Sequence, residues 1–263
     1  MRTVSRNFID VKFRGHYFSL QNSLLPKKFT ICSVTLTHRT RKISTYFARC
    51  ITVERLFKSK DNPYIKKIMN TLLNVKVLAG STREGRFSNQ PAVWIAGELK
   101  KHTHVQADII DLRDYDLPFF NEMVSPSMKT SPYKNEVVEQ FTEKIAEGDA
   151  FVIVTPEYNH STSGVLKNAL DWVYQEWNNK PVAFVSYGSV GGARAVEHLR
   201  LIAVELQMAP IRNAVHIPGA SYFPVMMGQS SADTLFATMQ SSADAMIEQL
   251  LWWTQALKNA RQG

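Results

Sequence analysis

Residues 150–172 read AFVIVTPEYNHSTSGVLKNALDW, and this stretch decides the fold of the chain. Its first five residues are apolar, which predicts a strand buried on both faces of a parallel sheet. Pro156 ends the strand because it has no backbone N–H to donate, and Asn159 and Ser161 favour a turn. From residue 164 the apolar spacing becomes helical. The expected buried face of that helix consists of Val165, Ala169 and Trp172 or Val173.

The same alternation of strand and helix continues on both sides of this stretch. Apolar runs predict further strands at 75–79, 105–112, 181–187 and 211–217. Helical spacing appears at 91–101, 136–147, 196–206 and from about 232. Such alternation predicts a doubly wound parallel sheet, here of five strands. The apolar faces expected to be buried are Val93, Ile95, Ala96 and Leu99 in one helix, and Met239, Ala243, Met246, Leu250, Trp253 and Leu257 in the last.

The net charge of +8 is unevenly distributed along the chain. Residues 1–68 hold 15 Lys and Arg against three Asp and Glu, or +12, whereas the remaining 195 residues hold 16 against 20, or −4. The basic segment is compatible with an organellar targeting peptide, a basic arm, or a stretch outside the natural protein, with translation starting at Met69. We favour the last reading. We therefore expect a poorly ordered or separate extension at 1–68 and the functional domain at 69–263.

Cysteine usage and hydropathy exclude several classes of protein. Cys32 and Cys50 both fall in the basic segment, and no Cys/His cluster has the spacing of a zinc site or disulfide scaffold. No apolar run approaches the roughly 20 residues of a membrane-spanning helix. We expect a cytoplasmic protein without a membrane span, a metal site or a specific nucleic-acid partner.

The loop at 80–89 has the character of a phosphate cradle. It combines a glycine turn, the hydroxyls of Ser81, Thr82 and Ser88, and the start of a helix, all of which favour an anion. Arg83 or Arg86 is available to neutralise the anion's charge. A P-loop is excluded because Arg86 and Phe87 occupy the positions that require Lys and Ser or Thr.

Two further loops are expected at the same edge of the sheet, because they follow the strands at 150–154 and 181–187. The loop at 156–161 offers backbone donors, an aromatic ring and an amide, which suit a planar heterocycle. The adjacent Gly191 and Gly192 allow the backbone to approach a flat ligand closely. The competing interpretation is a pair of ordinary strand-to-helix turns with Glu157 facing solvent. His160 is a conceivable proton donor, but a lone loop histidine is more often a hydrogen-bonding or solvent-facing residue.

Taken together, the three loops resemble those of the NADPH-dependent FMN reductase family of flavodoxin-like proteins, which includes quinone, azo-dye and chromate reductases. The likeness extends over roughly residues 75–217. The residues that carry it are Gly80, Ser81, Thr82, Arg83, Ser88 and Asn89, then Pro156, Glu157, Tyr158, Asn159, Ser161, Gly164, Lys167, Asn168, Ala169, Asp171 and Trp172, and finally Gly188, Gly191 and Gly192.

This resemblance implies non-covalent FMN at the sheet edge and NADPH as co-substrate. The phosphate would be held by Ser81, Arg83, Ser88 and Asn89. The isoalloxazine would be lined by Pro156, Glu157, Tyr158 and Asn159, and bordered on its other side by Ser186, Gly188, Gly191 and Gly192. Family members form homodimers or homotetramers, an interface that Trp172, Trp177, Trp252 and Trp253 are able to serve. No catalytic side chain is required, because the cofactor carries the chemistry.

Two other functions compete with the reductase. A flavodoxin-type electron carrier would bind FMN without turning over NADPH, but Arg83 and the weak acidity of residues 69–263 disfavour it. A nucleic-acid-binding protein would depend on the basic arm, and the chain has no named nucleic-acid motif. The sequence leaves open the electron acceptor, the preference between NADPH and NADH, and the oligomer size.

Overall fold

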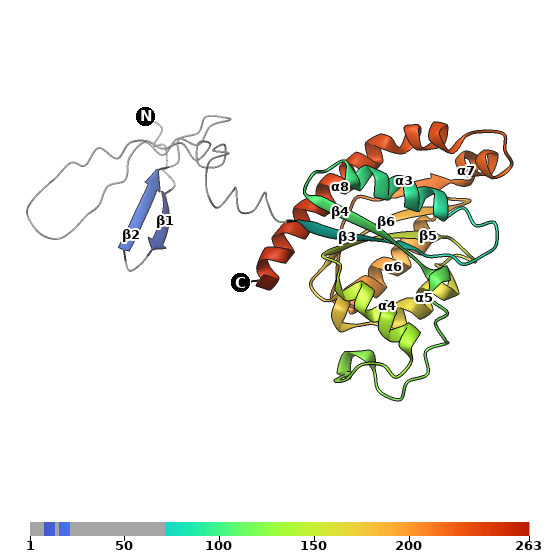
Figure 1. The fold of residues 1–263 in the computed structure, drawn as a ribbon. Helices are drawn as coiled ribbons and strands as arrows, with labels where there is room; N and C mark the ends of the chain where they lie inside the picture. Colours follow the sequence, from blue (N-terminus) through green and yellow to red (C-terminus); the bar gives the residue numbers. More distant parts are fainter. Residues whose placement is uncertain (1–7, 14–15, 22–71, 263) are drawn as a thin grey trace, which may run out of the picture. The chain divides into compact units, whose positions relative to one another are not determined.

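The computed structural model describes residues 8–13, 16–21 and 72–262 (Figure 1). The strands β1 (Phe8–Phe13) and β2 (His16–Gln21) form an antiparallel hairpin in one unit of the chain, which sequence periodicity did not predict. The other unit begins at Thr71. Most of the basic segment, together with Cys32, Cys50 and Met69, lies outside the described residues. Its separation from the functional domain therefore stays a prediction.

Residues 72–262 contain the predicted doubly wound parallel sheet. Its order is β4 (Val105–Asp111), β3 (Leu73–Ala79), β5 (Ala150–Pro156), β6 (Pro181–Gly188) and β7 (Ala209–Pro210), and β8 (Val215–Pro218) also pairs with β6. All these pairs are parallel. Every residue of β5 and β6 is buried, as their continuous apolar runs predicted. The chain winds outward from β3 in both directions, so the strand order reverses between β3 and β5.

Helices cover both faces of the sheet (Figure 1). The residues of α3 (Asn89–Lys100) and α8 (Ala232–Gln262) pack with Val75 and Val77 on one face. The helices α4 (Glu136–Ala146), α5 (Gly164–Asp171) and α6 (Ala193–Glu205) pack with Leu78 on the other. Short 3-10 helices occur at Leu112–Asp114, Pro126–Met128 and Gln175–Trp177. The helix α7 (Gly219–Met226), which contains Pro224, was not predicted.

The predicted fifth strand at 211–217 is wrong in its extent. The chain pairs with β6 at Ala209–Pro210, leaves the ladder, and returns at Val215–Pro218. The side chain of Gln249 on α8 accepts the backbone N–H of Asn213 at 2.9 Å, and the Asn213 amide donates to the Ala245 carbonyl at 3.0 Å. These bonds to α8 replace the bonds that a continuous edge strand would make.

Three residues assigned to buried helix faces are exposed instead. Val93 is 56% exposed, Val165 is 40% exposed and Trp253 is 36% exposed. The rest of each face is largely buried, including Ile95, Ala96 and Leu99, Ala169 and Trp172, and Ala243, Met246 and Leu250. The predicted buried faces of these helices were therefore too wide, because a helix packed against a sheet buries only the side nearest to it.

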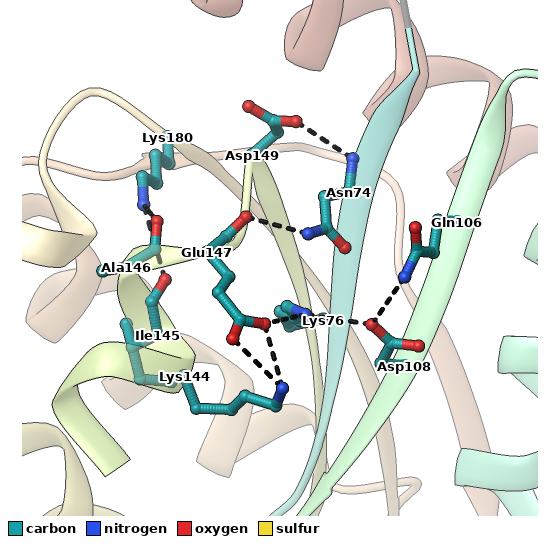
Figure 2. Close-up of polar contacts among 10 residues, drawn as sticks. All are labelled: Asn74, Lys76, Gln106, Asp108, Lys144, Ile145, Ala146, Glu147, Asp149 and Lys180. Carbon is teal, nitrogen blue, oxygen red and sulfur yellow. Dashed lines mark hydrogen bonds and ion pairs between the residues drawn. The ribbon is translucent and has the colours of Figure 1, made fainter. Parts of the chain in front are cut away.

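A network of charged side chains lies toward the amino-terminal ends of the strands (Figure 2). The fully buried ammonium of Lys76 donates to Asp108 at 3.0 Å and to Glu147 at 2.7 Å, and Lys144 also reaches Glu147. These hydrogen bonds lower the pKa of both carboxyl groups. The three loops of interest follow the opposite ends of the strands, so this network supports the sheet and not the candidate site. Within the described residues, no helix is long and apolar enough to cross a bilayer.

Lys180 predicts a pH dependence of stability. Its ammonium is buried against α4, where it donates to the carbonyls of Ala146 at 3.0 Å and Ile145 at 3.4 Å (Figure 2). Burial, with a smaller contribution from Arg261, lowers the pKa of Lys180 from 10.5 to about 8. Between these two pH values the unfolded chain binds more protons than the folded one, so stability rises with pH.

We expect urea unfolding at pH 7.5, 8.5 and 9.5 to show this rise in the wild type and not in Lys180→Met. Between the pKa of Lys180 in the folded chain and that in the unfolded chain, the free energy of unfolding should rise by up to about 3 kcal/mol. Taking the difference between the two proteins removes the titration of tyrosines, which they share. Parallel stability curves for the two proteins would show that Lys180 stays charged in the fold.

Candidate functional site

The three loops predicted to form the site meet at the carboxyl edge of the sheet. The Ser81 hydroxyl of the first loop lies 2.9 Å from the Tyr158 hydroxyl of the second. The backbone N–H of Glu157 in the second loop donates to the Tyr187 carbonyl of β6 at 2.9 Å, directly before the third loop. The structure therefore brings together residues that are more than 100 positions apart in the sequence.

The first loop presents a buried hydroxyl and backbone N–H groups that have no hydrogen-bond partner within residues 72–262. Ser81 and Ser88 are fully buried, and within residues 72–262 the Ser88 hydroxyl has no hydrogen-bond partner. The N–H groups of Ser81, Thr82, Arg83 and Ser88 likewise donate to no acceptor in that range. Ser88 immediately precedes α3 without capping it through its side chain. Donors left open at the start of a helix suit an anion.

The two arginines of the first loop have different environments. Arg83 is exposed, and its guanidinium carbon lies 5.3 Å from the centre of the Tyr158 ring. Arg86 points inward, where it donates to Asp111 at 2.7 Å in a bidentate pair and also to the Ser81 carbonyl. The interpretation of Arg86 as an alternative anion ligand is thus wrong, because a carboxylate already neutralises it. Asn89 is the exposed first residue of α3.

Asp111 is a supporting residue whose role the sequence did not reveal. Burial raises the pKa of its carboxyl group, but the hydrogen bonds from Arg86 and from the Arg113 backbone outweigh this effect and lower it overall. Arg113 in turn donates to the carbonyls of Thr82, at 3.4 Å, and Arg83. Two arginines and one aspartate thus engage the loop's carbonyls, whereas its N–H groups have no acceptor within residues 72–262.

The second loop is a tight turn held by α6. Tyr158 and Ser161 pair across Asn159 and His160, whose φ values are 47° and 74°. The left-handed region is unfavourable for histidine and is tolerated only when surrounding contacts enforce it. Here those contacts come from Arg194, which approaches His160 at 3.1 Å, and from His198, which lies 2.8 Å from the Ser161 hydroxyl.

Glu157 does not face solvent, contrary to the interpretation of this loop as a plain turn. Its carboxylate accepts the Arg194 side chain at 2.6 Å and the Arg194 backbone N–H at 3.1 Å, and its side chain is 4% exposed. The carboxylate therefore caps the first turn of α6 from a different loop. Pro156 is buried at the end of β5, and the N–H groups of Glu157 and Tyr158 donate to the carbonyls of Tyr187 and Ser161. Within residues 72–262, the backbone N–H of Asn159 is the donor of this segment that is left for a ligand.

The third loop owes its glycines to contacts within the protein. A Cβ on Gly192 would lie 2.7 Å from that of Ser186, and one on Gly191 would lie 3.1 Å from that of His216. Both glycines have positive φ, near 75°. Gly188 packs against Glu157, where a Cβ would come within 2.9 Å. The glycines therefore allow the chain to pack on itself, and their contact with a flat ligand stays a prediction.

The Ser186 hydroxyl is already hydrogen-bonded to the third loop itself. Its hydroxyl donates to the Gly191 carbonyl at 2.7 Å and lies 2.8 Å from Nδ1 of His216. Because the single hydroxyl proton goes to the carbonyl, His216 must carry a proton on Nδ1 and donate it to Ser186. Ser186 thus supports the loop from beneath, and a direct contact of its hydroxyl with a ligand would require this network to break.

An aromatic cluster under the first loop was missed by sequence reasoning. The Tyr187 ring packs edge-on against Phe87, at 5.2 Å between centroids, and against Tyr222 at 5.5 Å. The Tyr187 hydroxyl is buried and has no hydrogen-bond partner within residues 72–262. In the sequence, this cluster is indicated by the hydroxyl of Tyr187 at the end of a largely apolar strand. Because the whole strand was expected to be buried, Tyr187 was read as a core residue and not as part of the site.

Comparisons with known proteins agree with this geometry. Residues 73–221 match the family model described as NADPH-dependent FMN reductase, a span that contains all three loops. An NAD(P)H-dependent FMN reductase of Schizosaccharomyces pombe is 35% identical over 155 residues, which cover 58% of this chain and 78% of that protein. A quinone reductase of Escherichia coli K12 is 38% identical over 146 residues, covering 52% and 73%.

A solved structure shows the same fold at much lower sequence identity. The apo form of an NADH:FMN oxidoreductase superposes with a TM-score of 0.53 at 15% identity, covering 68% of this chain and 90% of that one.

Proposed function

The chain belongs to the NADPH-dependent FMN reductase family, and on that premise we propose that its three loops bind FMN. Through this bound FMN, the protein passes electrons from NADPH to free FMN, a quinone or a similar acceptor. The observation that carries this proposal is the cradle of the first loop. It combines the unpartnered Ser88 hydroxyl, unpartnered N–H groups and the start of α3 at the carboxyl edge of the sheet. Such a set of donors fits a phosphate group.

At the phosphate end, we assign binding to Ser81, Arg83, Ser88 and Asn89. Ser88 is a buried donor at the start of α3, whereas Arg83 is exposed. The guanidinium of Arg86 holds the Ser81 carbonyl and does not take part directly. The loop therefore provides hydrogen bonds from buried donors and charge from an exposed side chain.

At the ring end, the backbone of Pro156, Glu157, Tyr158 and Asn159 and of Gly188, Gly191 and Gly192 is proposed to border the isoalloxazine. Arg194 fixes Glu157, and the Ser186–His216 pair fixes the third loop. The backbone N–H of Asn159 and the closely packed backbone of the two loops would position a planar ring without an acid or base in the protein. When bound, FMN itself accepts and donates the hydride.

His160 has no role as a proton donor in this proposal. Arginine has no acceptor, so the 3.1 Å contact between Arg194 and Nδ1 of His160 requires an unprotonated Nδ1. The His160 side chain thereby helps to hold the turn.

The experiment that tests this function is the visible spectrum of the purified full-length protein, followed by anaerobic addition of NADPH. We expect flavin absorption bands that NADPH bleaches and that an added quinone restores. Bound flavin that NADPH leaves oxidised would instead support the electron carrier. A colourless protein that does not take up FMN would contradict both.

We also propose that the protein is a homodimer or homotetramer in the cytoplasm. Support for the oligomer comes from apolar side chains on one segment, where Phe119 is 86% exposed, Met123 is 99% exposed and Met128 is 67% exposed. Exposed apolar groups of this size mark interaction surfaces when they gather. Light scattering should show a smaller mass for Phe119→Ser/Met123→Ser than for Leu201→Ser, a control that removes an exposed apolar side chain from α6. Equal masses would exclude the 119–128 segment as the interface.

A further inference from the structure

The Tyr187 hydroxyl stands out among the buried polar groups near the site. Tyr187 is 4% exposed, and within residues 72–262 its hydroxyl has no hydrogen-bond partner. Burying an unpaired hydroxyl is unfavourable, so such groups need an explanation. A phenylalanine at this position would fill the same space without that penalty. The hydroxyl is therefore explained most directly by a partner that residues 72–262 do not supply.

The ring of Tyr187 is fixed by its neighbours. Phe87 and Tyr222 pack edge-on against it, and Phe87 also lies 6.5 Å from Phe236 between ring centroids. These contacts leave the hydroxyl in one position beneath the first loop. A donor that is already oriented loses little entropy when it binds a ligand.

The surroundings of the hydroxyl identify the chemistry of its missing partner. Burial raises the pKa of Tyr187, and the nearby hydroxyls of Tyr158, Ser88 and Ser81 also act on it, although none of them meets hydrogen-bond geometry with the Tyr187 hydroxyl. Tyr187 therefore keeps its proton and is available as a donor. Ser81 and Tyr158 bond to each other, which leaves Ser88 and Tyr187 as two open hydroxyls next to the start of α3.

We propose that the Tyr187 hydroxyl donates a hydrogen bond to the phosphate of FMN and makes the site prefer a phosphorylated flavin over riboflavin. This inference rests on the proposed function. A phosphate only accepts hydrogen bonds, and open donors at the start of a helix match it better than a ribityl hydroxyl, which both donates and accepts. Tyr187 extends the phosphate site from the first loop to the end of β6.

The matched experiment compares Tyr187→Phe with Tyr133→Phe in the full-length protein. Both changes remove one hydroxyl from a tyrosine, but the Tyr133 hydroxyl donates to the Trp172 carbonyl at 2.5 Å. Thermal unfolding of the flavin-free proteins should show a lower Tm for Tyr133→Phe. For Tyr187→Phe the Tm should be unchanged or higher, because the change removes an unpaired buried hydroxyl.

Flavin binding should show the opposite order. By quenching of flavin fluorescence, we expect Tyr187→Phe to weaken FMN binding at least about tenfold, the effect of one hydrogen bond to a charged group, and to leave riboflavin binding unchanged. Tyr133→Phe should bind both flavins like the wild type. Inorganic phosphate should raise the Tm of the flavin-free wild type, and this rise should be smaller in Tyr187→Phe.

Three results would overturn the inference while leaving the proposed function standing. Unchanged FMN affinity in Tyr187→Phe would show that the hydroxyl does not contact the flavin, and equal weakening for FMN and riboflavin would place it on the ribityl chain or ring. A large fall in the Tm of flavin-free Tyr187→Phe would show that the hydroxyl has a partner within the protein. If the wild type binds neither flavin, the proposed function itself fails, and the inference fails with it.

Discussion

Asp111→Ala is expected to destabilise the protein by about 3–5 kcal/mol, because it leaves a buried guanidinium without its counterion. The Arg86 side chain is 4% exposed, and Asp111 is its bidentate partner. Removing the carboxylate leaves Arg86 with the Ser81 carbonyl as its remaining acceptor. Chemical denaturation of the flavin-free protein measures the change.

Two further variants separate this explanation from a general effect of losing an aspartate. Asp171→Ala removes an exposed carboxylate that pairs with Lys167 at 2.7 Å on α5, and should cost less than about 1 kcal/mol. The double variant Arg86→Met/Asp111→Leu replaces both charges with apolar groups and should recover most of the stability. If Asp111→Ala is no worse than Asp171→Ala, the ion pair does not stabilise the first loop.

Gly192→Ala is expected to cost about 3 kcal/mol or more. A Cβ at this position would lie 2.7 Å from the Cβ of Ser186 and 2.9 Å from the backbone nitrogen of Tyr187. The φ of +75° adds roughly 1–2 kcal/mol of strain for any residue with a side chain, and crowding adds a further 1–3 kcal/mol. Because β6 does not move easily, the third loop must shift, so FMN binding should weaken as well.

Gly228→Ala is the matched control for this prediction. Its φ is +70°, but a Cβ there meets nothing within 4 Å, so it reports the backbone strain alone. We expect it to cost roughly 1–2 kcal/mol. Gly97→Ala, inside α3 and equally open, should stabilise the protein by roughly 0.5–1 kcal/mol. Equal losses for Gly192→Ala and Gly228→Ala would mean that the third loop accommodates the extra atom.

The sequence by itself determined the order of strands and helices from β3 to α6 and the position of the three loops. Continuous apolar runs such as 150–154 and 181–187 are read directly as buried parallel strands, because burial on both faces requires apolar residues at every position. Their carboxyl ends must meet at one edge. The sequence therefore predicts that the polar loops at 80–89, 156–161 and 188–192 lie together, and the motifs within them carry the resemblance to the family.

The tertiary structure alone decided which side chains of these loops are free to bind. Arg83 and Arg86 are equivalent in the sequence, but Asp111, 25 residues away, engages Arg86 and leaves Arg83 exposed. Glu157 is likewise held by Arg194, and Ser186 is hydrogen-bonded to Gly191 and His216. Within residues 72–262, the Tyr187 hydroxyl is left without a partner. The spacing of apolar residues specifies helices and strands because it reflects which side of each element is buried. The pairing of polar groups instead depends on contacts between segments that only the folded chain brings together.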